Sequence, residues 1–268
     1  ELFDGGVDAN SVAAACASSV TWVDLDASTP AEGPEAVAKL MEKKYEGATM
    51  VVDRVADGVR SSGATLYYDS EAGSGRRGTM YVEVDDAGLI TFVQEAWEPL
   101  YKPGSLTADL LKAVTANFEK EDKEPTYAPR KPKGASDTVR YLWEEANPGG
   151  AELDVALDLF ADDILYEDFN FEEPFVGREA VDGFLREFDF PGIEFVPERV
   201  SEGKDACAFT WRVLIGGEEG PKGVSFYSVK QGKVDFIRDI PAPAIKPPPL
   251  ATLAAVLQPK LRVFKPRT

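Results

Sequence analysis

An internal repeat constrains the fold of this chain more than any other feature of its sequence. The segment GPEAV at 33–37 returns as GREAV at 177–181, and Asp24 and Asp168 are separated by the same 144 positions. VVDRVADG at 51–58 and VPERVSEG at 196–203 lie 145 positions apart. The spacing persists to the last hairpin of each half. We therefore expect two copies of one domain, which a chain of 268 residues can accommodate.

Each copy shows the same order of predicted elements. A helix with apolar residues at helical spacing comes first, a short strand follows, and a second helix begins after a glycine. Long alternating stretches come next, and the segments DDAG and KQGK read as hairpin turns between them. Helices ahead of an antiparallel meander predict an α+β fold, with a curved sheet packed against helices in each domain.

The repeat also predicts the domain boundaries. A first domain is expected over 1–120 and a second over 136–250, joined by a charged, proline-rich linker at 121–135 and followed by a basic tail at 251–268. The second copy opens with an additional helix at 136–147. The first copy has no counterpart of this helix.

Charge excludes one class of partner. Lys and Arg number 29 against 47 Asp and Glu, and the net charge of −18 disfavours binding to nucleic acid. The tail, in contrast, carries basic residues and no acid after Lys246. It reads either as a docking segment for a protein partner, over 250–268, or as a solvated end. No apolar run is long enough to span a bilayer, and Glu1 in first position suggests a processed chain.

Residue types narrow the chemistry further. The chain has no histidine, which removes Ser-His-Asp and Cys-His catalysis and histidine-based metal sites. Cys16 and Cys207 each lie in an apolar run and are expected to be buried free thiols. The acidic cluster around Asp162 and Glu173 lacks an EF-hand spacing and reads as a solvated face. We expect no metal and no cofactor.

The order of elements and the segment FADDILYEDFNFEEPFVGREAV resemble the SnoaL-like and ketosteroid-isomerase-like superfamily, which shares the fold of nuclear transport factor two. The resemblance implies two tandem cone-shaped domains, each with an apolar pocket at one end. The ending GVSFYSVKQGKVDFIRDIPAPAIKPPP looks most like plastid-targeted plant and algal members, which implies a chloroplast location. The superfamily hosts isomerases, cyclases, pigment binders and interaction modules, so the fold alone does not give a function.

The resemblance also implies candidate site residues. Asp168 matches the position of the general base of the isomerases, Asp24 is its counterpart in the first copy, and Tyr141 matches the hydrogen-bonding tyrosine. The second acid of that family has no match, since Val224 stands near the corresponding place and Met80 in the first copy. From the residues themselves, Asp168 reads as a base, as pocket lining, or as a cap of the following turn.

Further residues are expected near the pockets. Trp22 and Tyr166 alternate with the two acids along their strands and read as core or pocket wall. Arg238 and Asp239 end the last strand, where a paired Arg-Asp could hold a polar ligand group. The predicted ligand-binding set is therefore Trp22, Asp24, Tyr166, Asp168, Arg238 and Asp239.

Two functions remain open from the sequence. The first is a non-catalytic binding or accessory protein of the plastid, which docks on a larger assembly through its tail or holds a small apolar ligand or pigment. The second is an isomerase- or cyclase-type enzyme acting on an apolar carbonyl compound, with Asp168 as base and Tyr141 as donor. A pocket filled by apolar side chains would favour the first, and an enclosed cavity at Asp168 and Tyr141 the second.

Overall fold

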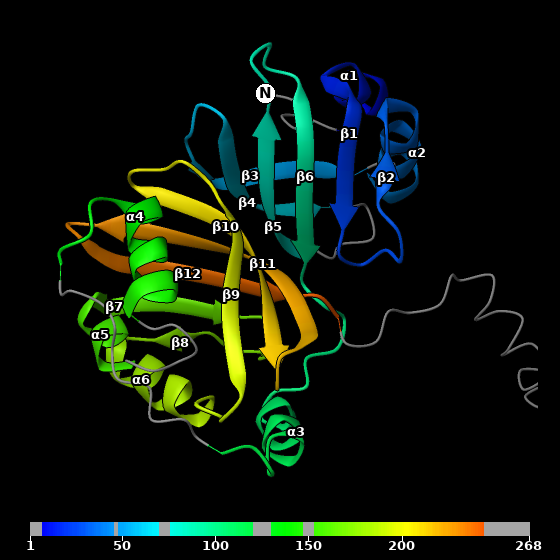
Figure 1. The fold of residues 1–268 in the computed structure, drawn as a ribbon. Helices are drawn as coiled ribbons and strands as arrows, with labels where there is room; N and C mark the ends of the chain where they lie inside the picture. The colour runs from blue at the N-terminus through cyan, green and yellow to red at the C-terminus, as the bar shows by residue number, and fades with distance from the viewer. Residues whose placement is uncertain (1–6, 46–47, 70–75, 120–129, 147–152, 244–268) are drawn as a thin grey trace, which may run out of the picture.

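The computed structural model describes residues 7–45, 48–69, 76–119, 130–146 and 153–243. They form two α+β domains, each with one six-stranded sheet and helices packed against it (Figure 1). The predicted fold class is thereby confirmed. No helix in these ranges is long and apolar enough to cross a membrane.

The first domain has the strand order β2-β1-β6-β5-β4-β3. Its core gathers Val12, Trp22, Val37 and Met41 between the helices and the inner face of the sheet. Its elements, in chain order, are α1 (Ala9–Ala14), β1 (Cys16–Asp24), β2 (Ala31–Glu32), α2 (Pro34–Tyr45), β3 (Thr49–Ala56), β4 (Ser61–Asp69), β5 (Arg76–Val84), β6 (Ile90–Trp97) and α3 (Leu106–Val114).

The second domain repeats this order as β8-β7-β12-β11-β10-β9. It has in addition an opening helix, which is α-helical up to Arg140 and π-helical from Tyr141. This helix packs against the inner face of the sheet. Its elements are α4 (Ala135–Arg140), the π-helical turn η1 (Tyr141–Ala146), α5 (Leu153–Asp158), β7 (Phe160–Asp168), β8 (Phe175–Val176), α6 (Arg178–Glu187), β9 (Ile193–Val200), β10 (Ala206–Ile215), β11 (Glu218–Lys230) and β12 (Lys233–Pro241).

One strand pairing in each sheet differs from the expected antiparallel meander. β1 runs parallel to β6, and β7 runs parallel to β12. The remaining pairs are antiparallel. A hairpin turn joins only antiparallel strands. The first and last strands of each sheet can pair in parallel because the helix and the long meander form the connection between them. This parallel pairing brings the carboxyl ends of the first and last strands together, which positions the site described below.

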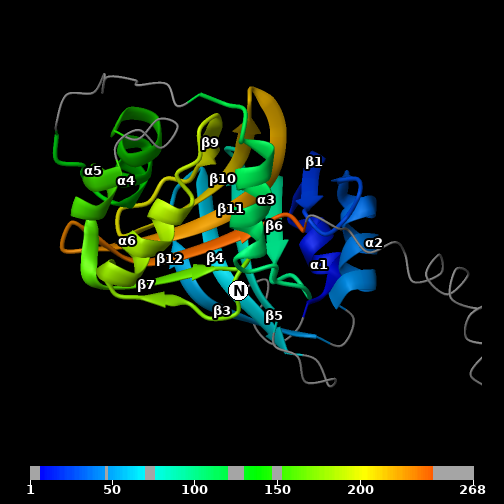
Figure 2. The same cartoon turned by 90° about the horizontal axis from the view of Figure 1, so that it is seen from below.

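The two sheets pack on each other through their outer faces. Tyr81 and Ala96 of the first sheet meet Val224 and Phe226 of the second in a shared apolar cluster. Figures 1 and 2 show the two sheets crossing, with α1 and α2 on the far side of the first sheet and α4, α5 and α6 on the far side of the second. The Cys16 and Cys207 thiols are free and buried, as expected from the sequence.

Two hydrogen bonds across this interface are related to each other by the internal repeat. Gln94 Nε2 donates to the carbonyl of Gly223 at 3.1 Å, and Arg238 Nη1 donates to the carbonyl of Gly78 at 3.4 Å. Gln94 and Arg238 are equivalent in the repeat, and so are Gly78 and Gly223. The interface is therefore pseudo-symmetric.

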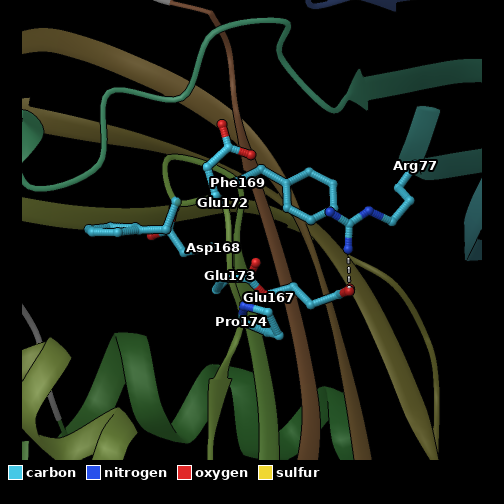
Figure 3. A pocket seen from close by; sticks show the side chains of 8 residues that line it. Arg77, Glu167, Asp168, Phe169, Glu172, Glu173 and Pro174 are labelled. Atoms are coloured by element: carbon cyan, nitrogen blue, oxygen red, sulfur yellow. Dashed lines mark hydrogen bonds and ion pairs between the residues drawn. The ribbon is translucent and has the colours of Figure 1, made fainter. Parts of the chain in front are cut away.

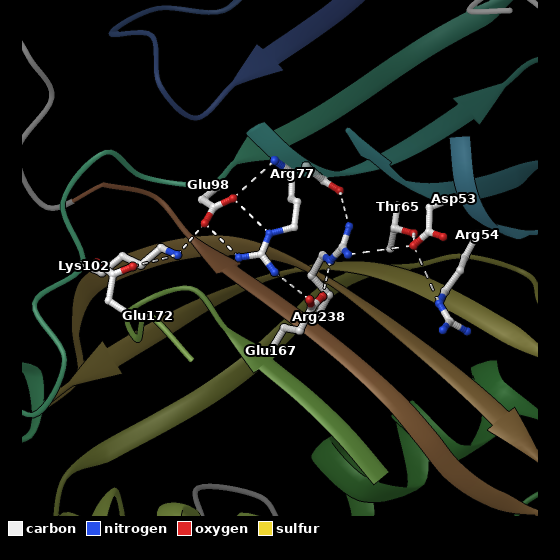
Figure 4. A network of polar contacts seen from close by, with 10 residues as sticks. Asp53, Arg54, Thr65, Arg77, Glu98, Lys102, Glu167, Glu172 and Arg238 are labelled. Atoms are coloured by element: carbon white, nitrogen blue, oxygen red, sulfur yellow. Dashed lines mark hydrogen bonds and ion pairs between the residues drawn. The ribbon is translucent and has the colours of Figure 1, made fainter. Parts of the chain in front are cut away.

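A charged network closes the same interface at one end (Figure 4). Glu167 of the second domain accepts from Arg77 of the first at 2.8 Å and from Arg238 at 2.6 Å. Arg77 also binds Glu98 at 2.9 Å, and Lys102 lies against Glu98 as well. These ion pairs tie the domains together beside the apolar cluster.

The segment after β6 crosses onto the second domain. The Gly104 amide donates to the Asn170 carbonyl at 2.7 Å, and the ring of Phe118 lies against Gly192 and Gly216. The predicted domain boundaries stay predictions, because much of the linker and the whole tail from residue 244 lie outside the described residues.

Candidate functional site

The parallel strands place two carboxyl groups side by side in each domain. Asp24 is the register partner of Glu95 in the first domain, and Asp168 is the register partner of Asp239 in the second. All four stand at the carboxyl ends of their strands, toward the helices. Asp239 and Glu95 are buried, with exposed fractions of 8% and 0%.

Two side chains hold Asp239 in the second domain, and a third supports one of them. Tyr166 donates its hydroxyl to Oδ2, and Ser225 donates its hydroxyl to Oδ1. The indole Nε1 of Trp211 donates in turn to Ser225 Oγ at 2.7 Å. Burial raises the pKa of Asp239 to about 6, although the hydrogen bonds from Ser225 and Tyr166 oppose the rise.

Asp168 is held through one oxygen only. Its Oδ1 accepts the backbone N–H of Asn170 at 2.8 Å and the Asn170 amide at 3.0 Å, so it does cap the following turn. Among the described residues, none donates a hydrogen bond to Oδ2. Burial, and then the charge of Asp239, raise the pKa of Asp168 to about 7 against these hydrogen bonds. The capping contacts therefore leave Oδ2 of Asp168 available for other contacts.

A cluster of aromatic side chains adjoins this carboxyl pair and reaches it through Tyr166. Tyr166 meets Phe184 edge to face at 5.3 Å, and Phe184 stacks on Phe175 at 4.2 Å. Phe171 and Phe188 complete the same wall, at 5.4 Å and 4.9 Å from Phe184. Such a lining suits an apolar ligand body, and it also fills much of the domain interior.

A small hollow lies beside Asp168 at the surface (Figure 3). It is a shallow dent that encloses no room for a water molecule. Its rim is mostly acidic, and Arg77 reaches Glu167 across it. The lining residues are Arg77, Glu167, Asp168, Phe169, Phe171, Glu172, Glu173 and Pro174.

The first domain holds a single ammonium group between its two carboxyl groups. Lys44 Nζ lies 2.7 Å from Asp24 Oδ2 and 2.9 Å from Glu95 Oε1, and Tyr45 donates to Glu95 Oε2 at 2.8 Å. Burial alone would lower the pKa of Lys44, but the charges of Glu95 and Asp24 outweigh it and raise that pKa. The ammonium also lies 5.5 Å from the ring centroids of Tyr45 and Trp97. Lys44 is thus a permanent cation in this pocket.

The predicted site residues divide between the two faces of the sheets. Trp22, Asp24, Tyr166, Asp168 and Asp239 all point toward the helices, in the domain interiors. Arg238 does not join them, because consecutive strand residues point to opposite faces. The structure places it at the interface between the sheets, against Glu167, rather than at a pocket mouth with Asp239.

The candidate donor Tyr141 is buried in η1, with the Arg130 guanidinium 4.8 Å from its ring centroid. Its role as donor stays a prediction. The phenol that the structure joins to the carboxyl pair is Tyr166. On the penultimate strand, Val224 points to the sheet interface and Ser225 points inward, so Ser225 is the inner residue at that place.

Sequence reasoning missed the Asp168–Asp239 pairing and the role of Lys44. The sequence predicts a pair of Asp239 and Arg238 at a pocket mouth. Consecutive residues of a strand point to opposite faces, and this alternation argues against such a pair. Lys44 is the penultimate residue of α2, and the equivalent position, 144 residues later, is Phe188, which directly follows α6. Comparing the two copies position by position could have revealed this exchange.

Comparison with known proteins supports the domain type. Residues 139–236 match the family model described as SnoaL-like domain, so the second half of the chain carries a SnoaL-like domain. The search of curated proteins finds no match.

Solved structures similar to this chain include three proteins from bacteria. A candidate ketosteroid isomerase from Kribbella flavida is 24% identical, covering 42% of this chain and 80% of its own, with a TM-score of 0.34. An NTF-2-like protein of unknown function from Burkholderia xenovorans is 16% identical, covering 43% and 88%, with a TM-score of 0.35. A Mycobacterium tuberculosis protein in complex with estradiol-17β-hemisuccinate is 20% identical, covering 34% and 81%, with a TM-score of 0.29.

Proposed function

We propose that this protein binds a small, largely apolar ligand in its second domain, and that the first domain serves as a fixed support. The observation that carries the proposal is the difference between the two carboxyl pairs. Asp24 and Glu95 share the ammonium of Lys44. Within the described residues, Asp168 and Asp239 form no ion pair, and an aromatic wall adjoins them.

The asymmetry favours binding in one domain only. A buried carboxyl pair without a cation is unfavourable, because desolvation disfavours the charged form. A protein can retain such a pair where a ligand group completes it. The packed aromatic wall and the small hollow fit a binding protein better than an open reaction chamber.

Ligand-observed mapping tests this proposal. We would add small aromatic and aliphatic alcohols, ketones, acids and amines to the full chain and follow the indole N–H signals of Trp211 and Trp22 by NMR. Trp211 bonds to Ser225 beside the carboxyl pair, whereas Trp22 lies in the core of the first domain. Selective shifts of Trp211 support the proposal. If no compound shifts Trp211, or if Trp22 shifts equally with each, the second-domain site is rejected.

A proton-transfer enzyme is the second candidate, and one observation favours it. The pKa of Asp168, at about 7, is suited to a general base near neutral pH. Asp239 and Tyr166 would then provide the neighbouring acid and donor, in place of the second acid that the sequence lacks on the penultimate strand. Exchange of the α-proton of a bound ketone into heavy water, lost in Asp168→Asn, would establish this activity. Unchanged exchange in that variant would exclude Asp168 as the base.

The accessory role and the plastid location rest on sequence alone, and the tail lies outside the described residues. We propose that 250–268 docks on a protein partner, since an apolar segment followed by basic residues complements an acidic surface. Truncation after Pro249 should release co-purifying partners from native extracts. The same set of partners with and without the tail would refute this role.

A further inference from the structure

We propose that the ligand of the second domain carries a protonated amine, whose nitrogen lies between Asp168 and Asp239. The inference rests on the proposed ligand site and names the class of ligand: a primary amine with an apolar body. The first domain provides the template, because it holds an ammonium group in the equivalent place.

The template is specific in its geometry. In the first domain one ammonium, Lys44 Nζ, is held by both carboxylates of the register pair, at 2.7 Å and 2.9 Å. Aromatic rings lie beside it at distances typical of a cation–π contact. The carboxyl pair at the ends of the parallel strands thus forms an ammonium site in this fold.

The second domain retains the pair but not the lysine. The position equivalent to Lys44 is Phe188, which follows the last residue of α6 and packs on Phe171 and Phe184. Asp168 Oδ2, the counterpart of the oxygen that binds Lys44 in the first domain, accepts no hydrogen bond from the described residues. A ligand ammonium would restore the contact that the exchange of lysine for phenylalanine removed.

Asp239 is arranged for the charged form as well. Both of its oxygens accept a hydroxyl, from Tyr166 and from Ser225, just as Glu95 accepts from Lys44 and Tyr45. Hydrogen bonds to a carboxylate favour its ionised state. The pair is therefore ready to ionise when a cation offsets its mutual repulsion.

The approach to the site also favours a cation. Glu167, Glu172 and Glu173 line the hollow beside Asp168. Glu167 is paired with Arg77 and Arg238, and Glu172 lies 3.5 Å from Lys102, so among the described residues Asp168 and Glu173 are the lining carboxyls without an ion pair. An acidic mouth on a chain of net charge −18 raises the local concentration of cations and repels anions. The aromatic wall behind the carboxyl pair would hold the apolar body of the ligand.

Matched probes test the inference on the full chain. We would measure binding of butylamine and 2-phenylethylamine against butanol and 2-phenylethanol by calorimetry at pH 8. Each amine should bind at least tenfold more tightly than its alcohol. At pH 5.5 this preference should shrink, because protonation of Asp168 and Asp239 removes the charges that hold the ammonium. Tyr166 and Tyr227 face the pair, and burial raises the pKa of both phenols, so neither titrates in this range. Asp168 also shares the hollow with Glu167, Glu172, Glu173 and Arg77.

Two variants identify the site, and a third serves as control. Phe188→Lys installs the internal ammonium of the first domain and should abolish amine binding. Asp168→Asn should reduce the amine preference to below threefold, and it keeps the inference testable if Phe188→Lys does not fold. Leu110→Lys adds the same charge on the exposed face of α3, where Leu110 is 56% exposed, and should leave amine binding intact.

The outcomes separate this inference from the proposed function. Equal binding of amines and alcohols, sensitive to Ser225→Val, would overturn the amine inference and leave the ligand site standing. Binding of neither class would overturn both. An amine preference that persists in Asp168→Asn would show that the ammonium lies elsewhere, and would also refute the inference.

Discussion

Gly63 and Ala208 occupy the same position in the two halves of the repeat and face each other across the interface between the sheets. A Cβ atom built on Gly63 would lie 2.1 Å from the Cβ of Ala208. Gly63 pairs with Tyr81 in its sheet, and Ala208 pairs with Phe226, the equivalent partner. Equivalent positions can meet only on the axis that exchanges the halves. The chain is therefore arranged like a symmetric dimer fused into one polypeptide.

The first prediction concerns this contact. Gly63→Ala should lower the free energy of unfolding by about 1–3 kcal/mol, because the added methyl overpacks the axis against Ala208 and the Met80 carbonyl. Ala208→Gly in the same chain should recover part of the loss. Urea unfolding of the single and double variants measures both effects.

The matched control is Gly183→Ala in α6, where an added Cβ meets nothing within 4 Å. That change should be neutral or stabilise the protein by about 0.5–1 kcal/mol through helix propensity. A loss in Gly63→Ala no larger than the change in the control would contradict the axis contact.

The repeat made much of the fold predictable. Its spacing aligned Asp24 with Asp168 and gave the order of helices and strands, since local patterns and turn residues encode these elements. The parallel pairing of β7 with β12 was not predictable in this way, because it joins segments far apart in the chain whose local patterns fit either direction.

The candidate site was therefore predicted only in part. Asp168 was identified from the repeat and from the resemblance to the isomerases, and Tyr166 because it alternates with Asp168 along one strand. Their contact with Asp239 depends on the long-range register between two strands. Arg238 was grouped with Asp239 by adjacency, and the structure separates them onto opposite faces.

The second prediction concerns the ion pairs between the domains. Glu167→Gln should lower the free energy of unfolding by about 3 kcal/mol, because Arg238, only 5% exposed, would lose its carboxylate partner. Asp182→Asn, which removes an exposed i,i+4 pair with Arg186, should change it by less than about 1 kcal/mol. Equal effects of the two changes in urea unfolding would show that the buried network contributes little.

The third prediction concerns pH. Asp168 has a folded-state pKa of about 7, raised from 3.8, so its protonated form is favoured in the folded protein. Its contribution to stability is present below the unfolded pKa and is lost as pH rises through 7. Asp168→Asn should therefore lose less stability than the wild type between pH 5 and pH 8. At pH 8 it should be more stable by up to about 3 kcal/mol.

Asparagine keeps an oxygen that can accept the Asn170 N–H, so the turn after β7 should be preserved in this variant. Denaturant unfolding at half-unit steps of pH gives the two curves. Parallel curves for wild type and variant would mean that the pKa of Asp168 is not raised by folding.

The fourth prediction concerns Lys44. In Lys44→Met the ammonium is removed while Asp24 and the fully buried Glu95 remain, so the free energy of unfolding at pH 8 should fall by about 3–5 kcal/mol. Burial already raises the pKa of Glu95 above its unfolded value against the attraction of Lys44, and loss of the cation should raise it further. The variant should then regain stability as pH falls toward 5, because protonation removes the uncompensated charge.

Adding Glu95→Gln to Lys44→Met should restore part of the loss at pH 8, with little further gain at pH 5. A deficit in Lys44→Met that does not depend on pH would indicate lost packing of the lysine stem instead, and would remove the basis for treating this carboxyl pair as an ammonium site.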